Sequence, residues 1–560
     1  MFVLGVHYGH DTSVALLRDG EVVSAASEER FSRRKRHDAR RHLWGMPQGA
    51  LDAVLASPGI RAADVGLVAV PVASLREDLR RLLRDEGVSV DGAVAFVLLA
   101  AHKTWNEGKL RLFLRRAGID APVIRVHHHA AHAWSAWGTS SGEPATVVTL
   151  DGKGDLLSGL VGHGDGEGVR VTREFAARDS IGLAYSTVTA VLGWRMDHDE
   201  GKTNALAAHG VPTRAVREAL ARLSVPTGDG GWRNEALRAV RSPFRLLKTP
   251  TKRVARRLGG AIGALGRPDI AAGIQELLER RVVALVQEAM DGPGPLVVAG
   301  GVFANVSLNR RLASLPEVTS LWVHPAMGDA GLALGAALAG AARFGARPAP
   351  LKDAFLGPAP DPADVARIAR SWPYRADLTN DSGSLAERVA ELLDRGLTVA
   401  VCRGRMEYGP RALGHRSILR RPDDVDGAAQ LNAILERDPV MPFAPVIRRV
   451  DLARCVTPPA AAHALLPFMT VAVRATPWFV RRCPAVVHKD GTSRVQVVDE
   501  DSFLSSVLGA FEARTGLPAL LNTSFNEHRA PIVCTAQDAF DAWRRTGLDA
   551  LVLGDRLLLR

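Results

Sequence analysis

The sequence predicts an α/β protein built from two domains. The chain has 560 residues, which is more than a single hydrophobic core usually organises. Segments 2–26 and 146–175 each predict a strand, a glycine-containing turn and a hairpin, which indicates an internal duplication. A stretch at 346–362 is rich in Pro and Ala and has weak periodicity, as linkers do. We therefore expect a first domain at 1–345, a linker at 346–362 and a second domain at 363–560.

The composition is ordinary for a globular protein, with 47% hydrophobic and 23% charged residues. No apolar run approaches the roughly 20 residues that a membrane span needs. The chain opens on an apolar strand pattern at 2–6, with no secretory signal pattern before it. Its four cysteines form no CxxC pair, which argues against a disulfide framework and against a cysteine metal site. These features predict a cytoplasmic protein without a membrane span.

The net charge of +11 permits binding to an anionic partner. Much of the excess comes from residues 233–257, which hold nine basic side chains and a single acid, Glu235. A solvated linker would explain this segment. Contacts with an anionic surface, such as a membrane face or an acyl-carrier partner, or with a nucleic acid would also explain it. The sequence leaves these alternatives open, although a nucleic-acid partner is not expected.

The first duplicated segment has a strand at 2–8, a turn at 9–13 and a hairpin around Asp19-Gly20. A glycine turn between strands lets backbone amides approach a phosphate, and a small hydroxyl such as that of Ser13 can join them. The charged stretch 28–36 follows and switches from acid to base. It predicts either a solvated loop or a clamp for an anionic group.

The second segment repeats this plan, from a strand at 146–150 into a turn at 151–155 and a hairpin at 158–171. Gly152 and Gly154 allow close backbone approach to a phosphate, and the neighbouring carboxylates can hold a metal bound to it. Two such openings are the architecture of the two-lobed actin-like fold, which binds a nucleotide in the cleft between its lobes.

Four of the seventeen histidines lie between His127 and His132, where a strand expected to be buried, 121–126, is followed by a helix. His128 and His132 are four residues apart, so a helix places both imidazoles on one face, within reach of one metal ion. Taken alone, the motif also fits a histidine-rich surface turn. Asp329, at the end of a later strand, either caps the next helix or supplies a third ligand. Two histidines with one carboxylate favour Fe²⁺ or a similar divalent metal.

Three further stretches predict contacts with a nucleotide or a phosphate. A buried strand leads into the turn 300–305, whose glycines would let an adenine ring lie against the backbone. The loop 404–417 carries three arginines among glycines. Guanidinium groups bind phosphate bidentately, so this loop predicts an anion cradle, with an arginine-rich surface loop as the alternative. The stretch 520–526 is a strand ending in polar residues suited to hydrogen-bonding a nucleotide.

Taken together, these motifs resemble those of the O-carbamoyltransferase family that includes NodU, CmcH and TobZ. The matching stretches are HDTS (10–13), EERFSRRK (28–35), HHAAHA (128–133), LDGKGD (150–155), DEGKTNALAAHG (199–210), GGVFANVSLN (300–309), HPAMGDAG (324–331), GRMEYGPRALGHRSI (404–418), PFAP (442–445), DGTSRVQVV (490–498) and LLNTSFN (520–526). Any one of them could arise by chance, whereas the ordered set covers nearly the whole chain and is very specific.

The resemblance implies an actin-like ATPase domain of two duplicated lobes, followed by a YrdC-like α/β domain. In the family, the second domain makes carbamoyl adenylate and pyrophosphate from carbamoyl phosphate and ATP. The first domain then transfers the carbamoyl group to a hydroxyl of a small-molecule natural product, as in antibiotic biosynthesis, and AMP leaves. ATP, Mg²⁺ and Fe²⁺ or another divalent metal are the cofactors so implied. The oligomeric state stays open, with a homodimer as one alternative.

The resemblance also implies roles for individual residues. Asp151 matches a family acid near the metal and joins His128, His132 and Asp329 as a ligand. The candidates for the general base are His10, Asp11 and Asp155, and the sequence does not choose among them. The expected nucleotide contacts are Ser13, Lys35, Gly152, Gly154, Lys202, Gly300, Gly301 and Asn305. The expected contacts to carbamoyl phosphate and ATP in the second domain are Arg405, Arg411, Arg416, Arg494, Asn522, Ser524 and Asn526.

One departure from the family pattern concerns the phosphate site of the second domain. The family usually shows Lys-x-Arg-Glu and an arginine directly before Pro-Phe-Ala-Pro, whereas here Glu436 stands for the lysine and Met441 for the arginine. An acid in place of that lysine should weaken phosphate binding strongly, unless Arg437 takes over through the altered register. The alternative function is therefore a family member with a degenerate adenylation domain, which uses another activated donor or catalyses a different group transfer.

Overall fold

The computed structural model describes residues 1–41, 45–86, 90–239, 251–376 and 382–560. It confirms the predicted α/β class and forms two compact units. Unit 1 holds Met1–Ala25 and Asp38–Lys352, and unit 2 holds Ala26–His37 and Asp353–Arg560. Arg241, Arg245 and Lys248 of the basic stretch lie outside the described residues. In the part of the chain that is described, no helix is both long and apolar enough to cross a membrane.

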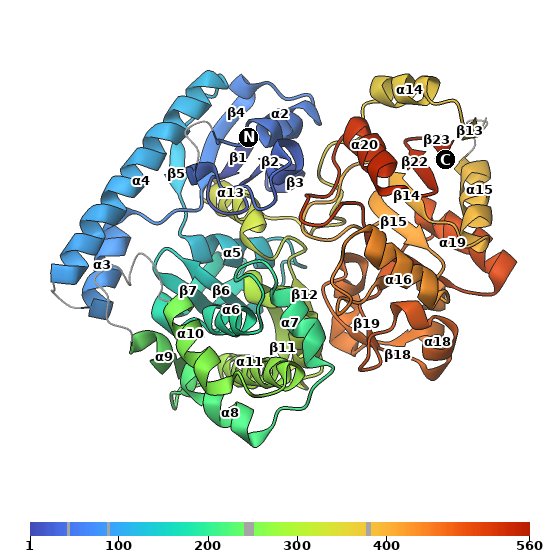
Figure 1. The fold of residues 1–560 in the computed structure, drawn as a ribbon. Helices are drawn as coiled ribbons and strands as arrows, with labels where there is room; N and C mark the ends of the chain where they lie inside the picture. The colour runs from blue at the N-terminus through green and yellow to red at the C-terminus, as the bar shows by residue number, and fades with distance from the viewer. Residues whose placement is uncertain (42–44, 87–89, 240–250, 377–381) are drawn as a thin grey trace. The chain divides into compact units, whose positions relative to one another are not determined.

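Unit 1 contains two five-stranded sheets with the same plan (Figure 1). The first runs β3-β2-β1-β4-β5, with β1 (Phe2–His7), β2 (Ser13–Arg18), β3 (Glu21–Ser27), β4 (Val65–Val70) and β5 (Val123–Arg125). The second runs β8-β7-β6-β11-β12, with β6 (Ala145–Gly154), β7 (Leu157–Asp165), β8 (Gly168–Ala176), β11 (Gly294–Ala299) and β12 (Val318–Val323). In each sheet the first strand pairs antiparallel with the second and parallel with the fourth, which pairs parallel with the fifth. The predicted duplicated, actin-like arrangement is thereby confirmed.

Two helices lie between these sheets (Figure 1). α13 (Leu332–Ala342) packs against β1, β2 and β4, while α5 (His128–Trp137) packs against β6 and β11. The two helices approach closely because glycine lies where they touch: a Cβ added at Gly335 would be 1.8 Å from the carbonyl oxygen of Ala131. Both helices share a buried cluster of small and branched residues with β4. This contact holds the histidine-bearing helix in a defined position relative to both sheets.

The remaining described helices of unit 1 follow the two sheets in chain order. They are α2 (Gln48–Ala56), α3 (Leu75–Glu86), α4 (Val90–Arg116), α6 (Ile181–Val191), α7 (Glu200–Ala207), α8 (Arg214–Leu220), α9 (Glu235–Arg238), α10 (Thr251–Ile262), α11 (Arg267–Ala289) and α12 (Val306–Ala313). α6 packs on β6, and α11 packs in turn against α6 and α7.

Two predicted elements differ from the structure. The strand at 121–126 was expected to be buried, but β5 has three residues and Val123 is 41% exposed, because β5 is the edge strand of its sheet. The turn expected at 151–155 is instead the irregular end of β6, which continues to Gly154. The chain reverses at Asp155 and Leu156, both of which have positive φ, as tight hairpin turns require.

Unit 2 is organised around an eight-stranded sheet with the order β13-β23-β22-β14-β15-β21-β16-β20. Its inner strands are β23 (Arg556–Leu559), β22 (Ala550–Leu553), β14 (Val399–Cys402), β15 (Arg416–Arg420), β21 (Ala519–Ser524) and β16 (Ala444–Arg448), and its edge strands are β13 (Arg375–Ala376) and β20 (Gln496–Val498). α15 (Ser382–Asp394) packs against α19 (Phe503–Thr515), and α20 (Ala536–Thr546) packs against β22 and β14. α14 (Pro362–Ser371), α16 (Val425–Ile434) and α18 (Pro477–Arg482) complete the helices of this unit that exceed five residues.

The short helix α1 (Glu29–Ser32) belongs to unit 2, although its segment was expected in the first domain. Arg33 donates hydrogen bonds to the carbonyl oxygens of Pro531 and Ile532, at 2.9 and 2.8 Å. Arg30 donates to the carbonyl oxygen of Gly409, at 2.8 Å. No local signal in the sequence points to these partners, because they lie hundreds of residues further along the chain.

We expect Gly335→Ala to destabilise unit 1 by about 1–3 kcal/mol, the usual cost of overfilling a packed contact, because its Cβ would collide with the Ala131 carbonyl. Gly260→Ala on α10 is the control, since a Cβ there meets no atom within 4 Å. That control should be neutral or stabilising by up to about 1 kcal/mol. Urea unfolding followed by circular dichroism measures both, and equal midpoints for the two variants would contradict this account of the helix contact.

Candidate functional site

Four side chains of unit 1 converge on one point: His128 and His132 of α5, Asp151 of β6, and Asp329 just before α13. One ligand atom from each lies within 4.8 Å of the others. Each histidine Nε2 is 3.5 or 3.6 Å from Asp151 Oδ2 and from Asp329 Oδ1. These separations are long for hydrogen bonds. They suit ligands placed about 2.1–2.5 Å from a shared centre, which is the range of divalent metal–ligand distances.

The burial of this four-residue cluster also fits a metal ion. Nε2 of His128 and Nε2 of His132 are buried without a hydrogen-bond partner, which is costly unless another group satisfies them. Burial lowers the pKa of His132, but the carboxylates of Asp151 and Asp329 outweigh it and raise the pKa to about 9. Although burial raises the pKa of Asp151, the two imidazoles hold it well below its usual range. Imidazole and carboxylate ligands together suit Fe²⁺ and similar divalent metals.

Asp155 holds the first turn of α5 in place. Its Oδ2 accepts hydrogen bonds from the backbone N–H groups of His128 and Ala73, at 3.1 and 2.6 Å. Its Oδ1 accepts one from Lys103 Nζ of α4, at 3.1 Å. Both oxygens of this candidate base are therefore engaged in positioning His128. Sequence reasoning missed Lys103, because no motif surrounds it on α4.

Two glycines near the cluster leave no room for a side chain, and two others donate backbone hydrogen bonds to Asp151. A Cβ on Gly154 would lie 2.1 Å from the His128 ring, and one on Gly300 would lie 2.1 Å from the carbonyl oxygen of Leu150. The N–H groups of Gly152 and Gly301 donate to Asp151 Oδ1, at 2.7 and 3.3 Å. Backbone N–H groups that were expected to approach a phosphate thus approach Asp151 of the cluster in this structure.

The turn after β1 carries a histidine–carboxylate pair next to the cluster. His10 Nδ1 lies 3.1 Å from Asp11 Oδ2, and Asp11 has a φ of 56°. His7 Nε2 lies 2.7 Å from the carbonyl oxygen of His10. Burial lowers the pKa of His7 to about 4, and the charges of Asp329 and His128, two candidate metal ligands, also act on it. Ser13 Oγ is buried without a hydrogen-bond partner.

Among the other expected nucleotide contacts, Asn305 and Lys202 have partners within the protein. Asn305 caps α12 by accepting from the Leu308 N–H at 2.9 Å, and its Nδ2 donates to Gln275 Oε1 at 2.8 Å. Lys202 Nζ lies 3.2 Å from Asp199 Oδ1. Lys35 is exposed and belongs to unit 2, whereas the rest of that predicted set belongs to unit 1.

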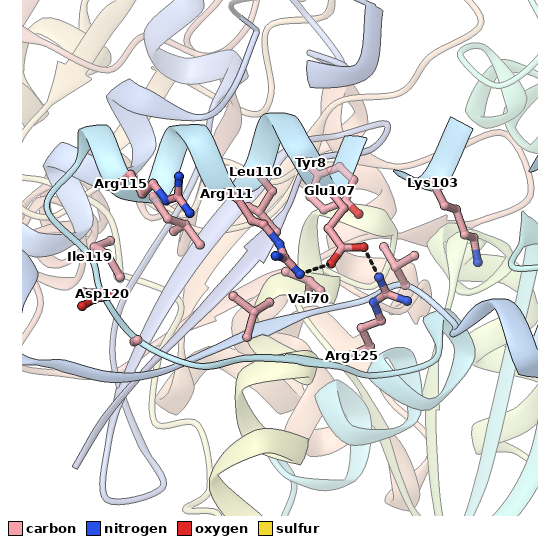
Figure 2. A pocket seen from close by; sticks show the side chains of 14 residues that line it. Tyr8, Val70, Lys103, Glu107, Leu110, Arg111, Arg115, Ile119, Asp120 and Arg125 are labelled. Atoms are coloured by element: carbon pink, nitrogen blue, oxygen red, sulfur yellow. Dashed lines mark hydrogen bonds and ion pairs between the residues drawn. The ribbon is translucent and has the colours of Figure 1, made fainter. Parts of the chain in front are cut away.

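A cavity of about 290 Å³ lies under α4, and one of its lining residues, Lys103, donates a hydrogen bond to Asp155 (Figure 2). Buried apolar side chains, among them Leu110 and Leu114, line it. Glu107 forms ion pairs with both Arg111 and Arg125, as Figure 2 shows. Arg115 also lines the cavity, and among the described residues it has no ion-pair partner. The cavity therefore combines an apolar wall with a cationic rim.

In unit 2, the charge of Arg494 acts on both Arg411 and Arg437, and among the described residues no acid is found to act on any of the three, which we call the arginine cluster. Burial lowers the pKa of both Arg437 and Arg494 to about 10, and the charge of Arg494 also lowers those of Arg437 and Arg411. Nε of Arg411 and Nε of Arg494 are buried without a hydrogen-bond partner. Buried like charges repel one another because little water is present to screen them. This arginine cluster therefore fits a polyanionic ligand such as a phosphate.

The structure accounts for the departure at 436–441. Glu436 follows α16 with a φ of 49°, and its side chain is exposed. Arg437 instead turns inward, donates a hydrogen bond to Thr523 Oγ1 and lies 4.3 Å over the ring of Phe443. Arg437 can thus compensate for the positive charge of the missing family lysine. The side chain of Glu436 is exposed and lies outside the arginine cluster.

Other residues expected to bind phosphate shape the loop 404–417 instead. Arg416 is fully buried and donates to the carbonyl oxygens of Arg403, Gly404, His415, Pro358 and Cys534. Arg405 donates to the carbonyl oxygens of Leu356 and Gly357. Glu407, which sequence reasoning missed although it lies within the motif, accepts from the N–H groups of Leu413, His415 and Arg416.

Three residues of β21 and the turn after it, Asn522, Ser524 and Asn526, were expected to contact the substrates. Asn522 Nδ2 donates to Gln496 Oε1 at 2.7 Å and lies 3.5 Å from the carbonyl oxygen of Ala412, while its Oδ1 is buried without a partner. Ser524 ends β21. Asn526 Nδ2 donates to the carbonyl oxygens of Glu527 and Ala530 and so closes its own turn.

These features define a class of protein: an actin-like unit carrying a histidine–aspartate cluster that could hold a metal, joined to an α/β unit with an arginine cluster. The chain belongs to the carbamoyltransferase family. Residues 3–338 match the model of the carbamoyltransferase N-terminus, and residues 390–560 match that of the carbamoyltransferase C-terminus.

Known relatives agree with this assignment. Nodulation protein NolNO of Sinorhizobium fredii is 32% identical over 98% of this chain and 79% of its own length. The 3'-hydroxymethylcephem-O-carbamoyltransferase of Amycolatopsis lactamdurans is 28% identical over 78% of this chain and 81% of its own. Component A of (R)-2-hydroxyglutaryl-CoA dehydratase from Acidaminococcus fermentans, a solved structure, matches 60% of this chain and 97% of its own at 16% identity and a TM-score of 0.34. This low similarity to the dehydratase component says nothing about the activity of the present chain.

We expect the protein to bind about one Fe²⁺ per chain under anaerobic conditions, and His132→Ala to weaken that binding at least tenfold by removing a ligand. His163→Ala on β7 is the control, since it lies outside the cluster. Metal content after gel filtration, measured by mass spectrometry of the elements, reports both. Equal metal content in the two variants would exclude this ligand set.

Proposed function

We propose that this chain is an ATP-dependent O-carbamoyltransferase with two half-reactions. Unit 2, as a YrdC-like domain, makes carbamoyl adenylate from carbamoyl phosphate and ATP: water cleaves carbamoyl phosphate to carbamate and phosphate, and a carbamate oxygen then attacks the α-phosphorus of ATP and releases pyrophosphate. Unit 1 transfers the carbamoyl group to a hydroxyl of a small molecule and releases AMP. The observation that carries the proposal is the uncompensated arginine cluster in a chain that also keeps four candidate metal ligands.

The arginine cluster supports the first half-reaction on electrostatic grounds. Carbamoyl phosphate and ATP are both polyanions and repel each other in water. Arg411, Arg437 and Arg494 would neutralise them, and guanidinium forks hold phosphate oxygens in defined directions. Mg²⁺ accompanies ATP in this proposal, as in other nucleotide-dependent reactions.

The residues around the cluster support the second half-reaction. His128, His132, Asp151 and Asp329 would hold a divalent metal, which when bound would supply Lewis acidity toward a carbonyl or phosphate oxygen. His10 is the favoured base for the acceptor hydroxyl, because Asp11 holds its Nδ1 and an oriented imidazole takes a proton at its other nitrogen. Asp155 is favoured as a positioning residue, since both of its oxygens already accept hydrogen bonds.

The cavity under α4 is the favoured acceptor site, because Lys103 links its wall to Asp155 and thereby to His128. Its apolar wall and its arginines suit an acceptor with an apolar body that is neutral or anionic. A polycationic acceptor would meet repulsion at the rim. The cephem that names the relative from Amycolatopsis lactamdurans shows that one family member acts on a hydroxymethyl group.

The alternative is a family member with a degenerate adenylation domain, which Glu436 and Met441 favour. The exposed position of Glu436 and the inward position of Arg437 weigh against it. Incubation of the protein with labelled carbamoyl phosphate, ATP and Mg²⁺ separates the two. Release of pyrophosphate that depends on carbamoyl phosphate supports the main proposal, and none supports another donor.

We expect Arg437→Ala to raise the KM for ATP or carbamoyl phosphate about 10- to 100-fold, because a charge-assisted hydrogen bond contributes about 1.5–3 kcal/mol. Arg481→Ala is the control, an exposed arginine on α18. Steady-state pyrophosphate release measures both. Unchanged kinetics in Arg437→Ala would remove this residue from the anion site.

His132→Ala should separate the two half-reactions. Pyrophosphate release should continue, because the arginine cluster belongs to unit 2, whereas carbamoyl transfer should fall at least a hundredfold through loss of a metal ligand. Transfer to the acceptor is followed by mass spectrometry, with the His163→Ala variant as the reference. Full transfer by His132→Ala would contradict the role given to the metal.

A further inference from the structure

α4 is apolar on two sides, and only one of them is covered. Its inner side, which includes Leu110, Phe113 and Leu114, is buried. Its outer side exposes Val90 (81%), Val97 (64%) and Trp105 (62%), and also Val94, Leu98 and Leu112. An apolar helix face is expected to be covered by another part of the protein or by a partner. Figure 1 shows α4 along the outside of unit 1, with α3 as its helical neighbour.

The exposed apolar side chains are concentrated on this hairpin of helices. Of the eighteen large hydrophobic residues exposed among the described ones, eight lie on α3 and α4. The two on α3 are Leu79 and Leu83. Monomeric proteins rarely expose a contiguous apolar patch of this kind, and such patches mark interaction surfaces.

The spacing along α4 is symmetric about one residue. The exposed outer side runs through positions 90, 94, 97, 101, 105, 108 and 112, which lie 11, 7 and 4 residues on either side of Ala101. An identical helix running in the opposite direction would therefore set Val97 against Trp105, Val94 against Gly108 and Val90 against Leu112. Gly108 offers space to its partner, since a Cβ there would meet no atom within 4 Å.

Charge favours the opposite direction as well. From Lys103 onward α4 carries Lys109, Arg111, Arg115 and Arg116 with only Glu107 as an acid, whereas 92–101 carry no charge at all. Two copies running in the same direction would bring the basic halves together, while opposed copies separate them and oppose their helix dipoles. We propose that α4 is the core of a two-fold symmetric dimer interface between two copies of this chain, with Ala101 on the axis. Such a self-complementary patch is what a two-fold interface requires.

Sedimentation equilibrium of the full chain tests the interface. Wild type should sediment at twice the chain mass of 59.9 kDa, and Trp105→Glu should raise the dimer dissociation constant at least a hundredfold. Phe344→Glu is the matched control, because Phe344 is equally exposed at 62% but lies off α4. A wild-type monomer at every concentration overturns the proposal. A dimer that Trp105→Glu leaves intact also overturns it, because the copies would then meet elsewhere.

Disulfide capture tests the register, since the four native cysteines are all buried. Under mild oxidation Ala101→Cys should cross-link to a covalent dimer, because residues on the axis meet their own copies. Val90→Cys should not cross-link to itself, but a mixture of the Val90→Cys and Leu112→Cys proteins should. Self-linking of Val90→Cys would indicate helices that run in the same direction and would overturn the antiparallel arrangement.

Discussion

The close contact between α5 and α13 is the constraint on which the site in unit 1 depends. α5 carries His128 and His132, and Asp329 lies directly before α13. Because Gly335 lets these helices approach at backbone distance, one interhelical contact positions three of the four candidate metal ligands. The fourth, Asp151, comes from β6, against which α5 packs. The same helices also join the two duplicated sheets, so the position of the site and the packing of the core have one cause.

Glycine has an analogous role within the cluster. Gly154 leaves room for the His128 ring, and the N–H groups of Gly152 and Gly301 fix one oxygen of Asp151. With that oxygen held, the other faces the imidazoles at 3.5 Å. Asp155 and Lys103 then secure the start of α5. These hydrogen bonds hold Asp151 and the start of α5 in place and leave the two Nε2 atoms without a hydrogen-bond partner.

Unit 2 presents the opposite electrostatic situation. Its arginine cluster brings cations together, whereas the cluster of unit 1 pairs acids with imidazoles. Arg416, with the same charge, is satisfied by five backbone carbonyl oxygens and so has a structural role. What distinguishes the two kinds of arginine is the availability of acceptors around them, and a sequence motif does not encode that. Glu407 fixes the conformation of the loop 404–417 by accepting hydrogen bonds from three backbone N–H groups, and the loop conformation in turn sets which acceptors lie near each arginine.

The α/β class, the duplication in the first domain and the pairing of His128 with His132 could be predicted from the sequence alone. Each of these follows from short-range periodicity, which a helix or a hairpin converts directly into geometry. The sequence also marked Asp151 and Asp329 through motifs, but not their distance from the histidines. Only the tertiary structure decided that β5 is an exposed edge, that residues 26–37 join unit 2 and that Arg437 rather than Arg416 belongs to the arginine cluster. These outcomes depend on which distant groups satisfy a buried charge or an open edge, and contacts across hundreds of residues leave no local pattern.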